Sequence, residues 1–229
     1  VITVPNDYTY IQDGIDAGIR GDYKTALEKL KPLADKGNAE AQRSMGLMYY
    51  RGEGVRKNYR EALKWNTKSA QQGNAKAQTT LGTMYLQGHG VKKNYIEAIK
   101  WFELAAKQNL PLAQAKLGMM YADGNGVPKN QTLAVKWLKL AAEQGDPMGQ
   151  IFLGRAYLEG KGVRRDLVET YKWFYIAKAN GETMVKRFLE KLVTFDNNVL
   201  FAASIIPYSI FLFYLYKIKS VNRFVKTGY

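Results

Sequence analysis

The chain has 229 residues, and its 34 lysines and arginines against 20 aspartates and glutamates give a formal net charge of +14. Hydrophobic residues make up 46% and charged residues 24% of the sequence, which excludes both a disordered chain and a polytopic membrane protein. There is no cysteine, which excludes disulfides, thiol nucleophiles and zinc–thiolate sites, and the single histidine excludes a histidine-rich metal site. We therefore expect no enzymatic activity, no cofactor, no metal and no small-molecule substrate.

The first 38 residues precede a regular pattern. Residues 1–9 are expected to be extended. Residues 10–38 read as a degenerate helix pair, with Ala17 and Ala26 at apolar positions and Gly21 at the turn. Because a stack of helix pairs needs an atypical unit at each end, this segment is predicted to cap the stack.

From residue 39 the sequence repeats every 36 residues, in copies that span 39–74, 75–110, 111–146 and 147–182. In each copy a glycine follows methionine or leucine, a tyrosine comes three residues later, and a G-x-G-V loop and a lysine–tryptophan pair follow. The recurring residues are Gly46, Gly82, Gly118 and Gly154, and Trp65, Trp101, Trp137 and Trp173. All four tryptophans of the chain fall in this register, which excludes a chance repeat.

Each copy is predicted to form two antiparallel helices. The first begins at Ala39, Ala75, Pro111 or Pro147, and Asn38, Asn74 and Asp146 stand where an N-cap is needed. The G-x-G loop ends this helix, because glycine adopts a positive φ without steric cost. The tyrosines at 49, 85, 121 and 157 lie on its apolar face, with hydroxyls expected to reach backbone groups between repeats.

The second helix is predicted to follow Asn58, Asn94, Asn130 or Asp166. Three of these have Glu61, Glu97 or Glu169 three residues later, the spacing of a reciprocal capping box. Gly73, Gly145, Gly181 and Asn109 are predicted to end it in a left-handed turn. Its tryptophan lies on an i, i+3, i+7 stripe of small residues, which favours the core over a ligand-stacking platform. The fourth copy departs at Gly149, Thr170 and Lys178, where looser packing or a differently used face is expected.

The repeating unit, A-x-x-x-L-G-x-x-Y-x-x-G-x-G-V-x-x-[ND]-x-x-x-A-x-x-W-x-x-x-A-A-x-x-G, is strongly similar to the Sel1-like repeat, and residues 77–106 match it at nearly every position. The related tetratricopeptide repeat has a period of about 34 residues, which does not fit. The resemblance covers about residues 10–195. It implies an all-α fold, an α/α superhelix or solenoid, that acts as an adaptor and holds another protein in its concave groove. Bacterial members are often exported, so it also implies a periplasmic or envelope location. The branch with a disulfide in each repeat is excluded here.

Basic residues follow the G-x-G loops in every copy. They are Arg56, Lys57, Lys92, Lys93, Lys129, Arg164 and Arg165, which we call the basic edge, because their period predicts a row along one edge of the superhelix. Because cations beside a helix N-terminus are locally unfavourable, their recurrence suggests a use, such as binding an acidic protein, an anionic membrane surface or a polyanion. Ordinary solvated loop charge is the competing interpretation. Nucleic acid is disfavoured, since no exposed aromatic residues are interleaved with the cations.

The remaining polar residues form no catalytic group. His89 occupies the variable position of one G-x-G loop, where a solvated side chain is expected, and it lacks partners for a metal. Glu53, Asp123 and Glu159 fall in successive copies and are expected to lie too far apart for paired-carboxylate chemistry.

The chain ends in two further segments. Residues 183–195 are predicted to form a capping helix. Residues 196–229 form a hydrophobic and basic tail, and 199–216 is a stretch of 18 uncharged residues, which just reaches the length of a membrane-spanning helix. An anchor is one interpretation of this stretch, and a helix packed on the end of the stack or a non-native extension are the others.

Three functions are consistent with the sequence. The first is a scaffold for a partner protein, held at a bacterial envelope. The second is an inhibitor or immunity protein that occludes a secreted toxin, and the third is a binder of anionic surfaces through the basic edge.

Overall fold

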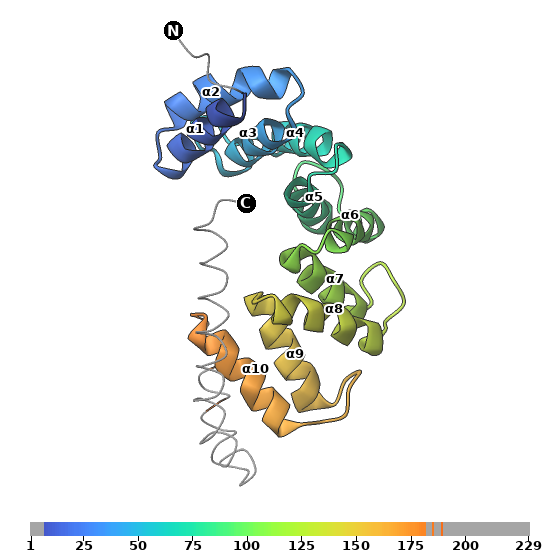
Figure 1. Cartoon of the computed structure of the whole chain (residues 1–229). Coiled ribbons are helices and arrows are strands. Elements are labelled where there is room, and N and C mark those ends of the chain that lie inside the picture. The colour runs from blue at the N-terminus through green and yellow to red at the C-terminus, as the bar shows by residue number, and fades with distance from the viewer. Residues whose placement is uncertain (1–6, 182–184, 186–188, 190–229) are drawn as a thin grey trace. The chain divides into compact units, whose positions relative to one another are not determined.

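A computed structural model describes residues 7–181 together with residues 185 and 189. Within 7–181 the regular structure consists of ten α-helices, each 13 residues long, which confirms the all-α class (Figure 1). The chain divides into two compact units, residues 1–129 and 130–229.

The first unit contains seven of these helices. They are α1 (Asp7–Ile19), α2 (Tyr23–Asp35), α3 (Ala39–Arg51), α4 (Tyr59–Gln71), α5 (Ala75–Gln87), α6 (Tyr95–Lys107) and α7 (Pro111–Asp123). Each helix packs on the next along the chain. Pairs are antiparallel, as α3 and α4 illustrate: the Ser69 hydroxyl near the end of α4 donates to the carbonyl of Ala39 at the start of α3. Helix α1 begins at Asp7, inside the segment expected to be extended, because residues 7–9 contain no proline or glycine to interrupt it.

The second unit contains α8 (Gln131–Glu143), α9 (Pro147–Glu159) and α10 (Leu167–Ala179). Helix α9 packs against both α8 and α10. The predicted capping helix over 183–195 and the tail over 196–229 lie outside the described residues, apart from residues 185 and 189. In the described part of the chain, no helix combines the length and the apolar character that a bilayer span requires.

The predicted N-caps are confirmed, but the reciprocal half of the capping box is wrong. The Asn58 side chain accepts hydrogen bonds from the backbone N–H groups of Arg60 and Glu61 at 3.0 and 3.2 Å. The N–H of Asn58 itself donates to the carbonyl of Tyr49 at 2.9 Å, so it is not available to Glu61. The same bond joins Asn94 to Tyr85 and Asp166 to Tyr157. The last turn of the preceding helix therefore supplies the acceptor that the glutamate was expected to supply.

The helix-ending residues adopt the expected left-handed conformation. Both glycines of the first G-x-G loop, Gly52 and Gly54, have positive φ angles of 80° and 70°. Asn109 has a φ of 61° and is the one non-glycine residue with positive φ in the described part of the chain. It stands where the other copies have glycine, and the left-handed turn predicted for it is confirmed.

The recurring glycine of the first helix lets the second helix approach closely. A Cβ placed on Gly82 would lie 2.8 Å from the ring of Phe102, and one placed on Gly154 would lie 2.7 Å from Phe174. Trp65 and Trp173 are buried, whereas Trp101 and Trp137 are half-buried at the edge of the core. The Tyr121 hydroxyl donates to the carboxylate of Glu103 at 3.4 Å and not to a backbone group, so the expected backbone partner is wrong there.

The looser packing expected in the fourth copy is not found at Gly149, the first position where this copy departs from the others. A Cβ placed on Gly149 would lie 2.8 Å from the Cβ of Ala141, so glycine here allows α9 to lie closer to α8 than alanine would. Thr170 is fully buried, and its hydroxyl donates to the carbonyl of Asp166 at 2.7 Å. Lys178 is exposed, whereas its counterpart Ala142 is buried.

A buried glutamine recurs with the repeat and ties successive helices together. Gln42, Gln78, Gln114 and Gln150 are all at most 4% exposed. The Gln78 side chain donates to the carbonyl of Ala70 at the end of α4, at 3.1 Å. It accepts from the side chain of Gln108 at the end of α6, at 2.8 Å. Gln42 forms the corresponding bonds to Ala34 and from Gln72, and Gln150 forms them to Ala142 and from Asn180. In these three copies the glutamine links the helix before it to the end of the second helix of its own copy.

Candidate binding pocket

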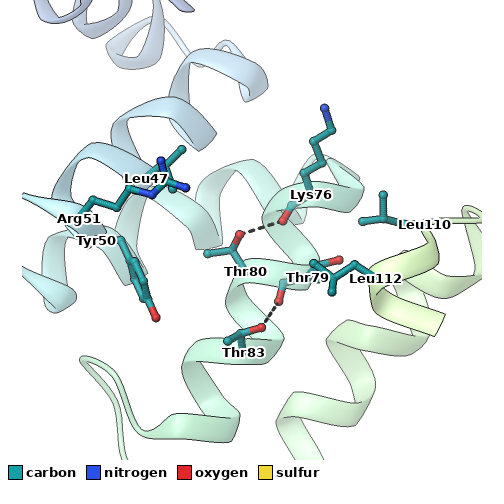
Figure 2. Close-up of a pocket in the computed structure, with 9 residues that line it drawn as sticks. All are labelled: Leu47, Tyr50, Arg51, Lys76, Thr79, Thr80, Thr83, Leu110 and Leu112. Atoms are coloured by element: carbon teal, nitrogen blue, oxygen red, sulfur yellow. Dashed lines mark hydrogen bonds between the residues drawn. The ribbon is translucent and has the colours of Figure 1, made fainter. Parts of the chain in front are cut away.

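The first unit contains an open pocket of about 430 Å³, which we call the α5 pocket. Figure 2 shows it bordered by the last turns of α3, the face of α5 that carries Thr80 and Thr83, and the start of α7. It thus lies across the first helices of three successive repeats. Its volume is within the range of about 300–1,000 Å³ typical of ligand sites.

Helix α5 forms the floor of the pocket. Lys76, Thr79, Thr80 and Thr83 lie at i, i+3, i+4 and i+7, so they share one face of the helix. The hydroxyl of Thr80 donates to the carbonyl of Lys76 at 3.0 Å, and that of Thr83 donates to Thr79 at 2.9 Å. These bonds hold the hydroxyl protons and leave the oxygens able to accept. Three short side chains in a row also leave room above the helix.

The two sides of the pocket come from α3 and α7. Leu47, Tyr50 and Arg51 project from the last turns of α3, and Leu110 and Leu112 come from the start of α7 (Figure 2). Leu112 is 45% exposed although it is large and apolar. The pocket therefore presents an apolar surface that no residue of the described part of the chain covers.

The lining residues occupy positions that vary from repeat to repeat. Lys76 corresponds to Glu40, Leu112 and Met148 in the other copies. Thr80 corresponds to Ser44, Lys116 and Phe152. The packing positions do not vary in this way. The buried glutamine, which with its bonds to neighbouring helices we call the glutamine ladder, recurs in all four copies. Helix stacking therefore does not require these particular lining residues.

The charge of the pocket is positive. Arg51 and Lys76 line it, and no carboxylate does. Burial disfavours the ionised form of the nearby Glu40, but hydrogen bonds from Arg43 and Asn74 outweigh it and hold the pKa of that carboxyl below its usual value. The Arg43 pair measures 2.6 Å. Arg51 lies 3.5 Å from Glu53 outside the pocket, a weak exposed contact.

An aromatic cluster supports one side of the pocket. The imidazole of His89 stacks on the ring of Tyr59, and its Nδ1 lies 2.9 Å from the hydroxyl of Tyr50. Burial raises the pKa of Tyr50, the nearby Tyr59 adds to this rise and Lys57 opposes it. The expectation of a solvated His89 is therefore wrong, because two tyrosines from α3 and α4 meet the loop at this point. The sequence signal was Tyr50, which stands where the other copies have leucine or alanine.

The basic edge lies outside the α5 pocket. All seven of its residues are exposed, and none forms an ion pair with another residue in the described ranges. Lys57 and Lys93 lie over the rings of Tyr59 and Tyr95, 4.8 and 4.5 Å from the centroids. The last cation of each group also packs by its Cβ against the glycine that ends the preceding helix, as Lys57 does against Gly52. That the groups form one continuous row stays a prediction.

The acidic residues do not gather into a metal site in the described part of the chain. Among the residues that the structure describes, no three histidine or acidic side chains cluster as metal ligands would. Glu159 pairs with Arg155 and Lys161, and hydrogen bonds from both lower the pKa of its carboxyl.

Comparison with known proteins places the chain. The family model described as Sel1 repeat matches residues 39–74, 75–110, 111–146 and 147–182. A crystal structure of a protective antigen present in uropathogenic Escherichia coli strains is 42% identical over 68% of this chain, with a TM-score of 0.66. This chain spans only 33% of that protein. A Sel1 repeat protein from Oxalobacter formigenes is 35% identical, with 78% of this chain and 74% of that chain covered and a TM-score of 0.70.

A third structure shows the fold alone. It is described as a Sel1 repeat protein from Klebsiella pneumoniae, is 17% identical, covers 82% of this chain and 93% of that chain, and has a TM-score of 0.56. Among curated proteins, no sequence matches this chain significantly. Sel1 repeat proteins are generally non-catalytic, and the family that matches this chain is not a catalytic one. The four family matches cover more than half of the sequence, and the chain therefore belongs to the Sel1 repeat family.

Proposed function

We propose that the protein is a non-enzymatic scaffold that binds a partner protein through the α5 pocket. The observation that carries this proposal is the contrast between recurring packing residues and varied lining residues. Gln78, on the buried side of α5, has a counterpart in every copy, whereas Thr80, on the open side, does not. An open surface whose residues are not needed for the fold is suited to recognition. The proposal rests on the first unit alone.

A bacterial envelope is the setting that we propose. The similar structures are bacterial, and one of them is described as a protective antigen. That description concerns a protein of which this chain spans a third, so it supports the location and says nothing of the partner. Anchoring by residues 199–216 remains part of the proposal, although this segment lies outside the described residues. An inhibitor of a secreted toxin would use the same pocket with a single tight partner.

A second candidate function is binding to an anionic surface through the basic edge. It is favoured by Lys57 and Lys93, which are exposed, free of ion pairs with described residues and held over tyrosine rings. Their cationic groups are thus presented at fixed positions. This mode predicts steep loss of binding as salt rises, and loss when Lys57, Lys93 and Arg165 are replaced by glutamate.

The test uses a variant in which the pocket is filled. Full-length protein, a Thr80→Trp variant and a matched Thr132→Trp variant are each used to capture proteins from an envelope extract of the producing cell. Thr132 is an exposed threonine on α8, outside the pocket. We expect a protein retained by the wild type and by Thr132→Trp but lost with Thr80→Trp. Equal retention by all three forms would exclude the pocket as the binding site.

A further inference from the structure

We propose that the α5 pocket binds an extended acidic segment of the partner, in which carboxylates stand beside apolar side chains. This inference rests on the proposed function and specifies the chemistry of the partner. Three features of the pocket carry it: two cations with no carboxylate in the lining, apolar residues on both sides, and the hydroxyl oxygens of its floor.

The charge of the pocket is complementary to carboxylates. Arg51 and Lys76 stand on different helices, α3 and α5, and no acidic residue lines the space between them. The local carboxylate of Glu40 is already bound by Arg43 and Asn74. Lys76 forms no ion pair within 4 Å with a residue of the described part of the chain, although its charge helps to lower the pKa of Glu40, and Arg51 has only the long contact to Glu53. A ligand with two separated carboxylates would find a partner for each.

The apolar residues of the pocket require apolar side chains beside the carboxylates of the ligand. Leu47 comes from α3, and Leu110 and Leu112 come from the start of α7, so apolar side chains stand on both sides of the threonine floor (Figure 2). Burying a leucine-sized side chain against such a surface is favourable, because the hydrophobic gain scales with the apolar area removed from water. An acidic peptide without an apolar residue would leave this surface exposed.

The floor of the pocket suits an extended backbone. Thr80 and Thr83 are partly exposed, and their hydroxyl protons already bond to carbonyls of their own helix. Their oxygens therefore act toward a ligand as acceptors. An extended peptide presents free N–H donors along its length, whereas a helix has used most of its own, so the floor favours the extended form.

The chain's own C-terminal segment does not meet these requirements. Residues 196–229 carry four cations, Lys217, Lys219, Arg223 and Lys226, against the single carboxylate of Asp196. This segment would place like charges beside Arg51 and Lys76. The tail therefore lacks the charge that the pocket requires, and a segment of a partner protein is the occupant that we propose.

The experiment selects ligands without assuming a sequence. A phage-displayed library of random short peptides is panned at low salt on the full-length protein and, in parallel, on Thr80→Trp. Peptides enriched on the wild type and lost on Thr80→Trp are sequenced, and the expected set is rich in aspartate and glutamate around a leucine, isoleucine or phenylalanine. If peptides are lost on Thr80→Trp but show no enrichment in acidic residues, this inference is overturned and the proposed function stands. No Thr80-dependent enrichment would overturn both.

A charge-swap measurement then tests the two cations directly. The affinity of a selected acidic peptide and of its Asn/Gln counterpart is measured by fluorescence anisotropy on the wild type, on Arg51→Gln/Lys76→Gln and on a control, Lys24→Gln/Lys107→Gln. The control loses the same charge at exposed lysines outside the pocket. We expect the acidic peptide to bind the wild type and the control about tenfold more tightly than its neutral counterpart, and this preference to vanish in the pocket variant. An equal preference in all three proteins would overturn the inference.

Discussion

The imidazole of His89 lies flat on the ring of Tyr59, with centroids 4.4 Å apart and planes inclined by 9°. Its Nδ1 meets the hydroxyl of Tyr50, which also lines the α5 pocket. A loop residue of the second repeat is therefore joined to both helices of the first repeat. This contact fixes the tyrosine that forms one side of the proposed binding site.

The contacts of His89 should stabilise the fold, and two substitutions can separate the contribution of the ring stacking from that of the hydrogen bond. His89→Ala removes the ring contact and the hydrogen bond, and it should lower the free energy of unfolding by about 1–2 kcal/mol. His89→Phe keeps a ring on Tyr59 and loses only the bond to Tyr50, so it should cost less. Urea denaturation of both variants measures the difference. If His89→Ala unfolds at the wild-type midpoint, the stack does not contribute to stability.

Replacing a glutamine of the ladder should lower the stability of the fold more than replacing a surface glutamine. Gln78→Met keeps the volume but removes the bonds to Ala70 and Gln108, and it should destabilise the protein by about 1 kcal/mol. The cost stays modest because the carbonyl of Ala70 also accepts from Gly73. Gln71→Met is the matched control at an exposed site. Equal midpoints for the two variants in thermal denaturation would argue against the ladder.

Gly82, in the middle of α5, and Gly18, near the end of α1, should respond to alanine in opposite directions. Gly82→Ala would bring a Cβ 2.8 Å from Phe102, and the overpacking should cost about 1–3 kcal/mol. Gly18 lies in α1, where the added Cβ would stand 3.7 Å from Ala26, an ordinary contact. Gly18→Ala should therefore stabilise the protein through its higher helix propensity, by at most about 0.5 kcal/mol because Gly18 lies in the last turn of α1. Differential scanning calorimetry would reveal the opposite signs, and a shift of both in one direction would contradict the packing described for Gly82.

The lowered pKa of Glu40 predicts an acid-dependent loss of stability. Its folded pKa lies below the usual 4.5, because the bonds from Arg43 and Asn74 outweigh burial. The carboxylate therefore stabilises the fold above its unfolded pKa, and this contribution is lost as the pH falls through the folded pKa. Glu40→Gln should show a shallower decline in the free energy of unfolding over this acid range. Parallel curves for the two proteins would indicate that Glu40 has no such role.

The repeat pattern predicted most of the fold because its positions have direct physical requirements. A left-handed turn needs glycine or asparagine, so Asn109 could be placed without a structure, and a helix start needs a side-chain acceptor, so Asn58 could be too. The partner of the Asn58 N–H could not be predicted, because it depends on where the preceding helix ends in space.

The candidate site was harder to predict for the same reason. The basic edge is visible in the sequence because it recurs, whereas the residues of the α5 pocket do not recur. Leu112 and Thr80 are distant in sequence and come together only when three repeats stack. His89 likewise gains its partners from a neighbouring repeat. The recurring glutamines were visible in the sequence at a period of 36, and only their burial shows what they do.

The most direct measurement of partner binding at the α5 pocket is amide hydrogen exchange of the full-length protein with and without its captured partner. Binding at the pocket predicts slower exchange in the last turns of α3, along α5 and at the start of α7. The loops of the basic edge, at Arg56–Lys57 and Lys92–Lys93, should keep their rates. Protection confined to those loops, with the backbone of α5 unchanged, would contradict binding at the pocket and favour the basic edge.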